Sequence, residues 1–214
     1  MLYLRAMAEL LKIHETHPQQ RLISKACAIV RRGGVIIYPT ECCYAIGCQL
    51  GDKSAVNRIR QIRRLGDEHH FTLACRDLSE LAKYATVSND IYRFLKAYTP
   101  GAYTFLLQAT KSVPRLLLQP KRKTIGIRVP ENRIAQSLLE TLDGPLMSVT
   151  LQLPYMDIPL IEAETIYDML GGQVDVVIDG GHCGIQPTSI VDLTSGSPEV
   201  IRVGRGETAT FSSE

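Results

Sequence analysis

Residues 35–47, VIIYPTECCYAIG, are the stretch from which the fold can be predicted. They open with VIIY, a short apolar run of the kind found in strands that are buried on both faces. Pro39 ends this run, because proline has no N–H to donate to a sheet ladder. Gly33 and Gly34 precede it and predict the end of a helix over residues 18–32, since glycine readily takes the left-handed conformation that closes helices.

The polar residues that follow this strand are the first candidates for a functional site. In open α/β sheets, ligands bind at the carboxyl ends of the central strands. Thr40, Glu41 and Tyr44 fall at such an end and supply a hydroxyl, a carboxylate and a phenol. We therefore expect a polar site at this edge of the sheet.

Alternating strand and helix patterns fill the rest of the chain, separated by Gly, Pro, Asp or Ser. Further strands are predicted over residues 44–48, 71–75, 103–109, 124–129, 146–151, 174–178, 189–193 and 200–203. Further helices are predicted over residues 52–65, 77–84, 89–98, 132–142 and 163–170. Strands and helices interspersed in this way favour a single α/β domain around a twisted, mixed sheet.

Composition and charge restrict the class of protein further. The 214 residues are 45% apolar, which is enough for a substantial core, and carry a net charge of +2. No run of about 18 or more apolar residues is present, so we expect no membrane span and no membrane partner. The first residues lack the pattern of a signal peptide, and either Met1 or Met7 could start the chain.

The six cysteines show neither disulfide nor zinc-site spacing. Cys42 and Cys43 are adjacent, and no C-x-x-C pair occurs. Buried thiols in a reducing compartment are the simplest interpretation, so we expect a cytoplasmic protein. We also expect no bound metal and no tightly bound cofactor. A catalytic Cys43 is the alternative, although spacing alone identifies no histidine partner.

Two clusters of basic residues stand out in this nearly neutral chain. The first, on the polar side of the helix predicted over residues 52–65, comprises Arg58, Arg60, Arg63 and Arg64. The second comprises Lys121, Arg122 and Lys123. The first cluster is either a solvated helix face or, at the helix end, a site for anions.

Residues 124–130, TIGIRVP, place Arg128 on one face of a strand and the isoleucines on the other. A buried arginine needs an anionic partner, because an unpaired charge is costly to bury. That partner is either a carboxylate of the protein, such as Glu41, or the phosphate of a ligand. The glycine-rich residues 180–189 also favour an anion site, since backbone N–H groups can approach an anion closely there.

Taken in order, these motifs resemble the YrdC/YciO family, and especially its YciO branch. The order is PTE-x-x-Y-x-x-G, an arginine-rich helix end, G-x-R-V-P, P-L-x-S, GG-x-x-G followed by S-I-V-D, and R-x-G. The strongest similarity lies at HPQQR (17–21), DEHHFTLACRDLSEL (67–81), TPGAYTF (99–105), KRKTIGIRVP (121–130) and GIQPTSIVDLT (184–194). The resemblance spans about residues 14–206, nearly the whole chain.

The resemblance implies a YrdC/RibB-like domain at residues 14–206, between an N-terminal segment (1–13) and a C-terminal tail (207–214). Such a domain has an open, twisted, mixed sheet with flanking helices and a concave basic face. Its best-understood relatives make threonylcarbamoyl-adenylate from threonine, bicarbonate and ATP, and the product feeds a modification of tRNA. Mg²⁺ would accompany the ATP and screen the pyrophosphate that leaves.

The resemblance also assigns roles to individual residues. Thr40 and Tyr44 would line the amino-acid and nucleotide pocket, while Arg64 and Arg128 would hold phosphates. The full set of implied substrate- and nucleotide-binding residues is Thr40, Tyr44, Arg64, Arg128, Ser148, Thr150, Thr188 and Arg202.

Two family elements differ in this chain. Ile62 stands where the K-x-R element has its lysine, and the adjacent Arg63 is expected to point elsewhere on the helix. Thr150 and Gln152 replace the S-x-N element, and glutamine is one methylene longer than asparagine. A displacement of ~1 Å in a positioning group can lower a rate ~100-fold.

Three functions follow as hypotheses. The first is ATP or adenylate binding with low or altered synthase activity. The second is non-catalytic binding of tRNA or double-stranded RNA by the two basic clusters, with a steep salt dependence. The third is an activity on another carbamoyl, phosphate or adenylate substrate.

Overall fold

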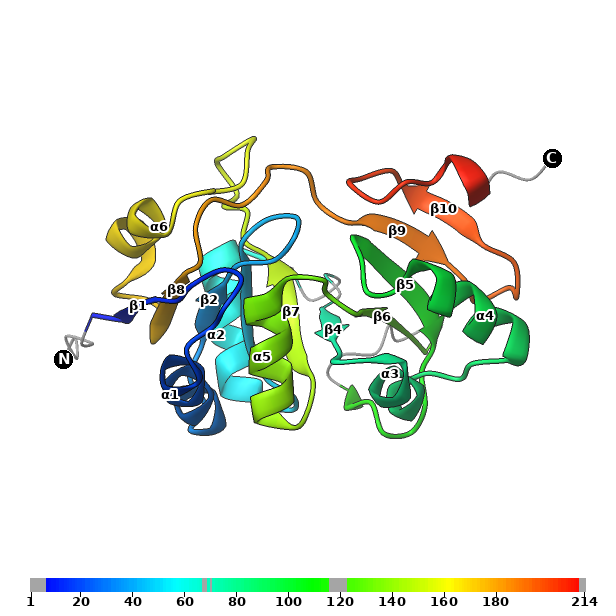
Figure 1. The fold of residues 1–214 in the computed structure, drawn as a ribbon, viewed down its shortest axis with the longest axis horizontal. Helices are drawn as coiled ribbons and strands as arrows, with labels where there is room; N and C mark the ends of the chain where they lie inside the picture. Colours follow the sequence, from blue (N-terminus) through cyan, green and yellow to red (C-terminus); the bar gives the residue numbers. More distant parts are fainter. Residues whose placement is uncertain (1–6, 67–68, 70, 116–122, 212–214) are drawn as a thin grey trace.

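The computed structural model describes residues 7–66, 69, 71–115 and 123–211. Within these residues, ten strands form one twisted sheet, and helices pack on both of its faces (Figure 1). The order of strands across the sheet is β1-β8-β2-β3-β7-β4-β6-β5-β9-β10. Parallel pairs such as β1 and β8 occur beside antiparallel pairs such as β2 and β3. The prediction of a single α/β domain with an open, mixed sheet is confirmed.

The elements have the following bounds. The strands are β1 (Glu9–Lys12), β2 (Ile36–Tyr38), β3 (Ala45–Gln49), β4 (Thr72–Ala74), β5 (Tyr103–Gln108), β6 (Thr124–Arg128), β7 (Leu146–Thr150), β8 (Val176–Asp179), β9 (Ser189–Asp192) and β10 (Glu199–Arg202). The helices are α1 (Gln20–Arg31), α2 (Lys53–Arg63), α3 (Leu78–Tyr84), α4 (Asn89–Tyr98), α5 (Arg133–Leu142), α6 (Ala163–Leu170) and the short 3₁₀ helix η2 (Ala209–Phe211). No helix in the part of the chain that the structure describes is long and apolar enough to cross a membrane.

The predicted strands and helices are present, with ends that differ by no more than two residues. The strand that the sequence pattern did not predict is β1, which pairs in parallel with β8 and places Leu10 opposite Val177. This strand lies inside the segment 1–13 that was expected to precede the domain. The domain boundaries themselves stay a prediction.

Local sequence explains where the helices begin and end. After α1, Gly33 has a φ of 84°, in the left-handed region that glycine tolerates. The Asn132 side chain caps α5 by accepting hydrogen bonds from the N–H groups of Ile134 and Ala135, at 2.9 and 3.1 Å. The Asp52 side chain caps α2 in the same way.

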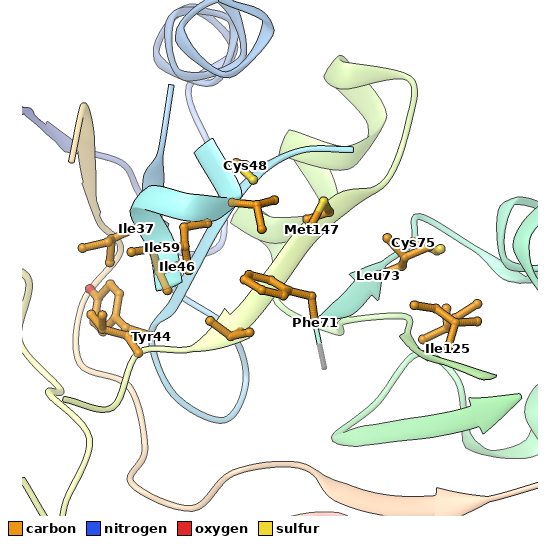
Figure 2. Close-up of a cluster of buried hydrophobic side chains, with 14 of the residues drawn as sticks. Ile37, Tyr44, Ile46, Cys48, Ile59, Phe71, Leu73, Cys75, Ile125 and Met147 are labelled. Carbon is orange, nitrogen blue, oxygen red and sulfur yellow. The ribbon is translucent and has the colours of Figure 1, made fainter. Parts of the chain in front are cut away.

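Two hydrophobic cores lie on the two faces of the sheet. The first core packs α2, α3, α4 and α6 against one face, and Figure 2 shows its centre around Phe71 and Met147. The second core packs α1 and α5 against the other face, where it covers Ile36 and Val176. Alternate residues of one strand enter different cores, as period-2 strand geometry requires.

The sheet face that carries the second core has apolar side chains at one end of the sheet and polar side chains further along. On β6, Ile125 and Ile127 enter the first core, so Arg128 lies on the opposite face. On β7, Met147 enters the first core, so Ser148 lies on the opposite face. Beyond the part that α1 and α5 cover, the same sheet face carries polar side chains that line one pocket, among them Ser148, Thr72, Arg128 and Thr104. This polar part of the sheet holds the candidate site.

Candidate anion-binding site

A pocket of about 270 Å³ opens on the polar part of the sheet face. Three arginines line it: Arg63, Arg128 and Arg202. Five hydroxyl side chains also line it: Thr72, Thr104, Ser148, Thr150 and Thr188. The other lining residues are His69, Val149, Gln152, Pro187 and Ile190. Among the described residues that line the pocket there is no carboxylate, so the site is cationic and rich in hydroxyl groups.

Arg128 is buried at the end of β6 and bound by Glu41. Its Nη2 donates to Glu41 Oε1, while Glu41 Oε2 accepts a hydrogen bond from Glu131 N at 3.2 Å. Burial opposes the charge, but the carboxylate outweighs it and the pKa of Arg128 is raised. Of the two partners expected for Arg128, the structure therefore shows the carboxylate. The Nε of Arg128 is buried without a hydrogen-bond partner among the described atoms.

Arg63 also presents a buried nitrogen without a partner. Its Nε has no hydrogen-bond acceptor among the described atoms, and burial lowers the pKa of its guanidinium. A buried donor without an acceptor is unfavourable, and such groups are typical of sites that receive an anion. The expectation that Arg63 points away from the site is wrong, because the side chain lines the pocket.

Arg202 and two threonines form a fixed group at the β9 side of the pocket. The Nε and Nη2 of Arg202 donate to Thr188 O at 3.2 and 2.8 Å. The Thr188 hydroxyl lies 2.9 Å from the Thr104 hydroxyl, and both side chains are buried. Burial lowers the pKa of Arg202. These contacts hold one guanidinium and two hydroxyls in a single orientation.

Ser148 is positioned by Tyr38, which reaches it from β2 across Gly47 of β3. The phenol of Tyr38 donates to Ser148 Oγ at 2.8 Å, and both residues are buried. Because a serine hydroxyl can accept and donate at once, the Ser148 hydrogen stays available for a ligand. The side chain of Gln152 is held differently, since its Nε2 donates to Met156 O and Asp157 O at 3.5 and 3.4 Å.

Thr40 and Tyr44 are not among the residues that line this pocket. The Thr40 hydroxyl donates to Cys43 O at 2.7 Å and accepts from Cys42 N at 3.2 Å, which shapes the turn after β2. The Tyr44 hydroxyl donates to Gly181 O at 2.7 Å and so ties this turn to the glycine-rich loop. Both side chains thus have a structural role here, and their role in ligand binding stays a prediction.

Arg64, which was assigned to phosphate binding, is also outside the pocket lining. It is the C-cap of α2 with a left-handed φ of 48°, and its guanidinium carbon lies 5.7 Å from the centre of the Tyr155 ring. Ile62, at the position of the family lysine, packs against the first core. Because the helix ends at Arg63 and the chain turns at Arg64, Arg63 is the residue that reaches the pocket.

The remaining arginines of the first basic cluster are engaged by their own chain. Arg58 Nη1 lies 2.9 Å from Asp175 Oδ2, and its Nη2 donates to Gln173 O at 3.0 Å. Arg60 donates to Gly66 O and sits over the Phe71 ring, 5.3 Å from its centre.

The second basic cluster is described only at its last residue. Lys123 is exposed, with a φ of 53°, whereas Lys121 and Arg122 lie outside the described residues. RNA binding by the two clusters stays a prediction.

Sequence reasoning missed two hydroxyls of the pocket, Thr72 and Thr104. Each is followed two residues later by an apolar residue, so neither strand shows a clean polar face. Thr72 pairs with Gly126 across β4 and β6, and a Cβ built on Gly126 would lie 3.3 Å from the Thr72 hydroxyl. Only the strand order brings these residues beside Arg128.

Fold and pocket together define an α/β protein with an arginine-lined site on an open sheet face. The sequence model of the Sua5/YciO/YrdC family, described as "Telomere recombination", matches residues 28–204. The protein YciO of Escherichia coli (strain K12) is 53% identical over 205 residues, which cover 96% of this chain and 100% of that protein. A Haemophilus influenzae protein is 51% identical over 206 residues, with coverage of 96% and 100%. This chain therefore belongs to the Sua5/YciO/YrdC family.

Solved structures of the family have the same fold. The crystal structure of E. coli YciO superposes with a TM-score of 0.92 over 96% of this chain and 100% of that chain. The structure of P. abyssi Sua5 complexed with L-threonine superposes with a TM-score of 0.83 at 23% identity, over 91% of this chain and 57% of that chain. The likeness to Sua5 is a likeness of fold.

Proposed function

We propose that the pocket binds the phosphates of ATP or an adenylate, and that the protein carries out low or altered threonylcarbamoyl-adenylate chemistry. The observation that carries this proposal is the meeting of Arg63, Arg128 and Arg202 at one small pocket lined by five hydroxyls. Two of these arginines have a buried Nε without a hydrogen-bond partner among the described atoms. Phosphate oxygens are the acceptors that guanidinium groups bind best.

The proposed reaction needs the features that this site offers. A carbamate made from threonine and bicarbonate attacks the α-phosphate of ATP through its oxygen, and pyrophosphate leaves. Positive charge must neutralise the phosphates and the leaving pyrophosphate, which is a role for the three arginines. Threonine is a small polar molecule, so the site has to bind it through hydrogen bonds, and the hydroxyls of Ser148 and Thr150 can make them. The Sua5 relative that was solved with L-threonine has the same fold and supports this choice of amino acid.

A magnesium ion fits this site only together with the nucleotide. Mg²⁺ prefers oxygen ligands and is commonly held by substrate phosphates, waters and one or two carboxylates. The described lining offers hydroxyls but no carboxylate, so the ion would be held by the phosphates and waters, and the Thr72 hydroxyl could orient one of its waters. The ion would supply charge screening of the pyrophosphate.

The altered family elements favour low or altered activity over full synthase activity. Ile62 packs into the first core, so the described pocket has arginine but no lysine. Gln152 directs its amide to the carbonyl groups of residues 156 and 157. Both changes remove a ligand-positioning group that the family resemblance implies.

Product analysis tests the proposal. The protein is incubated with α-labelled ATP, Mg²⁺ and bicarbonate, with threonine, with serine, or without an amino acid. Threonine-dependent release of pyrophosphate with a labelled adenylate supports the proposed chemistry. Nucleotide binding without any amino-acid-dependent product would limit the function to binding, and the absence of binding at millimolar ATP would refute the proposal.

A further inference from the structure

The described pocket is small for a whole nucleotide. Its volume of about 270 Å³ lies below the ~300–1,000 Å³ that is typical of sites for small molecules. With the phosphates at Arg63, Arg128 and Arg202, we expect the base to lie beyond the described lining of the pocket. The question is which side chain at the rim can receive it.

An exposed aromatic ring lies close in the chain to a residue of the pocket lining. Arg63 and Gln152 line the pocket, and their near neighbours in the chain, Arg64 and Tyr155, contact each other without being among its lining residues. The Arg64 guanidinium lies over the ring of Tyr155, which is 67% exposed. One face of this phenol is thus covered by a cation, and the side chain otherwise stands largely in solvent.

The loop that carries Tyr155 is held by a residue of the pocket itself. Gln152 Nε2 donates to the carbonyl groups of Met156 and Asp157, on the far side of Tyr155 in the chain. These bonds fix the turn next to the pocket. The glutamine that replaces the family asparagine therefore connects the pocket to the aromatic ring.

We propose that Tyr155 is the stacking platform for the base of the bound nucleotide, with Arg64 holding the ring in place. This inference rests on the proposed function, since it concerns the base of the nucleotide whose phosphates the pocket binds. Nucleobases stack on tyrosine rings and on guanidinium planes, and loss of one such platform typically weakens binding about tenfold. The platform recognises any purine ring and does not contact the phosphates.

A tryptophan reporter tests the location directly, because the chain contains no tryptophan. Tyr155→Trp keeps an aromatic platform and gives the chain a single tryptophan, at the proposed stacking position. Tyr92→Trp is the matched control, since Tyr92 is also exposed but lies on α4. We expect ATP to quench the fluorescence of Tyr155→Trp saturably, tripolyphosphate to leave it unchanged, and neither to affect Tyr92→Trp beyond collisional quenching.

Calorimetric titration separates base binding from phosphate binding. Tyr155→Ala should bind ATP about tenfold more weakly than the wild type and tripolyphosphate equally well, while Tyr155→Phe should bind ATP like the wild type. Equal ATP affinity of Tyr155→Ala and wild type overturns the platform but leaves the proposed function intact. A wild type that binds neither ATP nor tripolyphosphate overturns both.

Discussion

Arg128 and Glu41 form an ion pair at the pocket in which only 9% and 10% of the two side chains are exposed. The pair joins the turn after β2 to the end of β6, two parts of the chain that are 87 residues apart. Because the Nε of Arg128 has no hydrogen-bond partner among the described atoms, the pair does not use the whole guanidinium. A phosphate in the pocket would therefore share Arg128 with Glu41.

Replacing the carboxylate of this pair should destabilise the protein strongly. Glu41→Gln leaves the buried charge of Arg128 without a counter-charge, a change that typically costs ~3–5 kcal/mol. Urea unfolding followed by circular dichroism measures the loss. The exposed Glu140→Gln is the control and should change the free energy of unfolding by less than ~0.5 kcal/mol.

The same variant tests whether the pocket attracts anions. Inorganic phosphate should stabilise Glu41→Gln more than the wild type, because the anion replaces the lost carboxylate beside Arg128. Equal stabilisation of both proteins by phosphate would contradict an anion site at Arg128.

Removing either partner of the hydrogen bond between Tyr38 and Ser148 should lower the free energy of unfolding by different amounts. Ser148→Ala leaves the buried Tyr38 hydroxyl without an acceptor and should cost ~1–3 kcal/mol. Tyr38→Phe should cost less, about 1 kcal/mol or below, because Ser148 borders the pocket and can bond to water. The double variant should be no less stable than Ser148→Ala. Urea midpoints that fall in the opposite order would contradict the claim that the Tyr38 hydroxyl relies on Ser148 as its acceptor.

Removing Arg63 should not destabilise the fold. Burial lowers the pKa of this guanidinium, and its Nε is buried without an acceptor among the described atoms, so removing the group relieves a desolvation cost. Arg63→Met keeps an apolar stem and should leave the free energy of unfolding equal to or above that of the wild type. The exposed Arg21→Met serves as the control. A clear loss of stability in Arg63→Met would mean that the arginine has a structural role.

Stability should decline in alkaline solution because of the buried thiols. Burial raises the pKa of Cys27 to about 11 and that of Cys48 to about 12. In the unfolded chain these thiols ionise near pH ~8.5, so their contribution to the free energy of unfolding is fully present below that pH. It is lost as the pH rises from there through the folded-state pKa values.

Urea midpoints measured at pH 7.5, 8.5, 9.5 and 10.5 test the sign of this effect. Cys48→Ala should be less stable at pH 7.5, since it leaves a cavity, but should show a shallower decline above pH ~8.5. A midpoint that is constant up to pH 10.5, or equal slopes in both proteins, would contradict the role of the thiols.

The sequence predicted most of the fold because its periodicity and helix-ending residues agree. Asn132 before α5 and the glycines after α1 lie where the structure has a helix cap and a left-handed turn. Strand β1 escaped prediction because ELLK is short and charged at both ends, and only its parallel pairing with β8 makes it a strand.

The candidate site was predicted in part, for a local reason. The pocket brings together Arg128, Ser148 and Thr188, which stand in recognisable strand motifs. Arg64 was expected at the phosphate site, whereas Arg63 lines the pocket. Which of the two reaches it depends on the residue at which α2 ends, because a one-residue difference there turns a side chain in another direction. Sequence patterns do not fix helix ends that closely.

A calorimetric titration of Mg²⁺·ATP into the wild type and Arg63→Met tests the central claim most directly. If the arginines form a nucleotide phosphate site, the wild type binds ATP and Arg63→Met binds at least about tenfold more weakly, while its fold is retained. Absence of binding by the wild type at millimolar ATP, or equal affinity in the two proteins, would contradict the account.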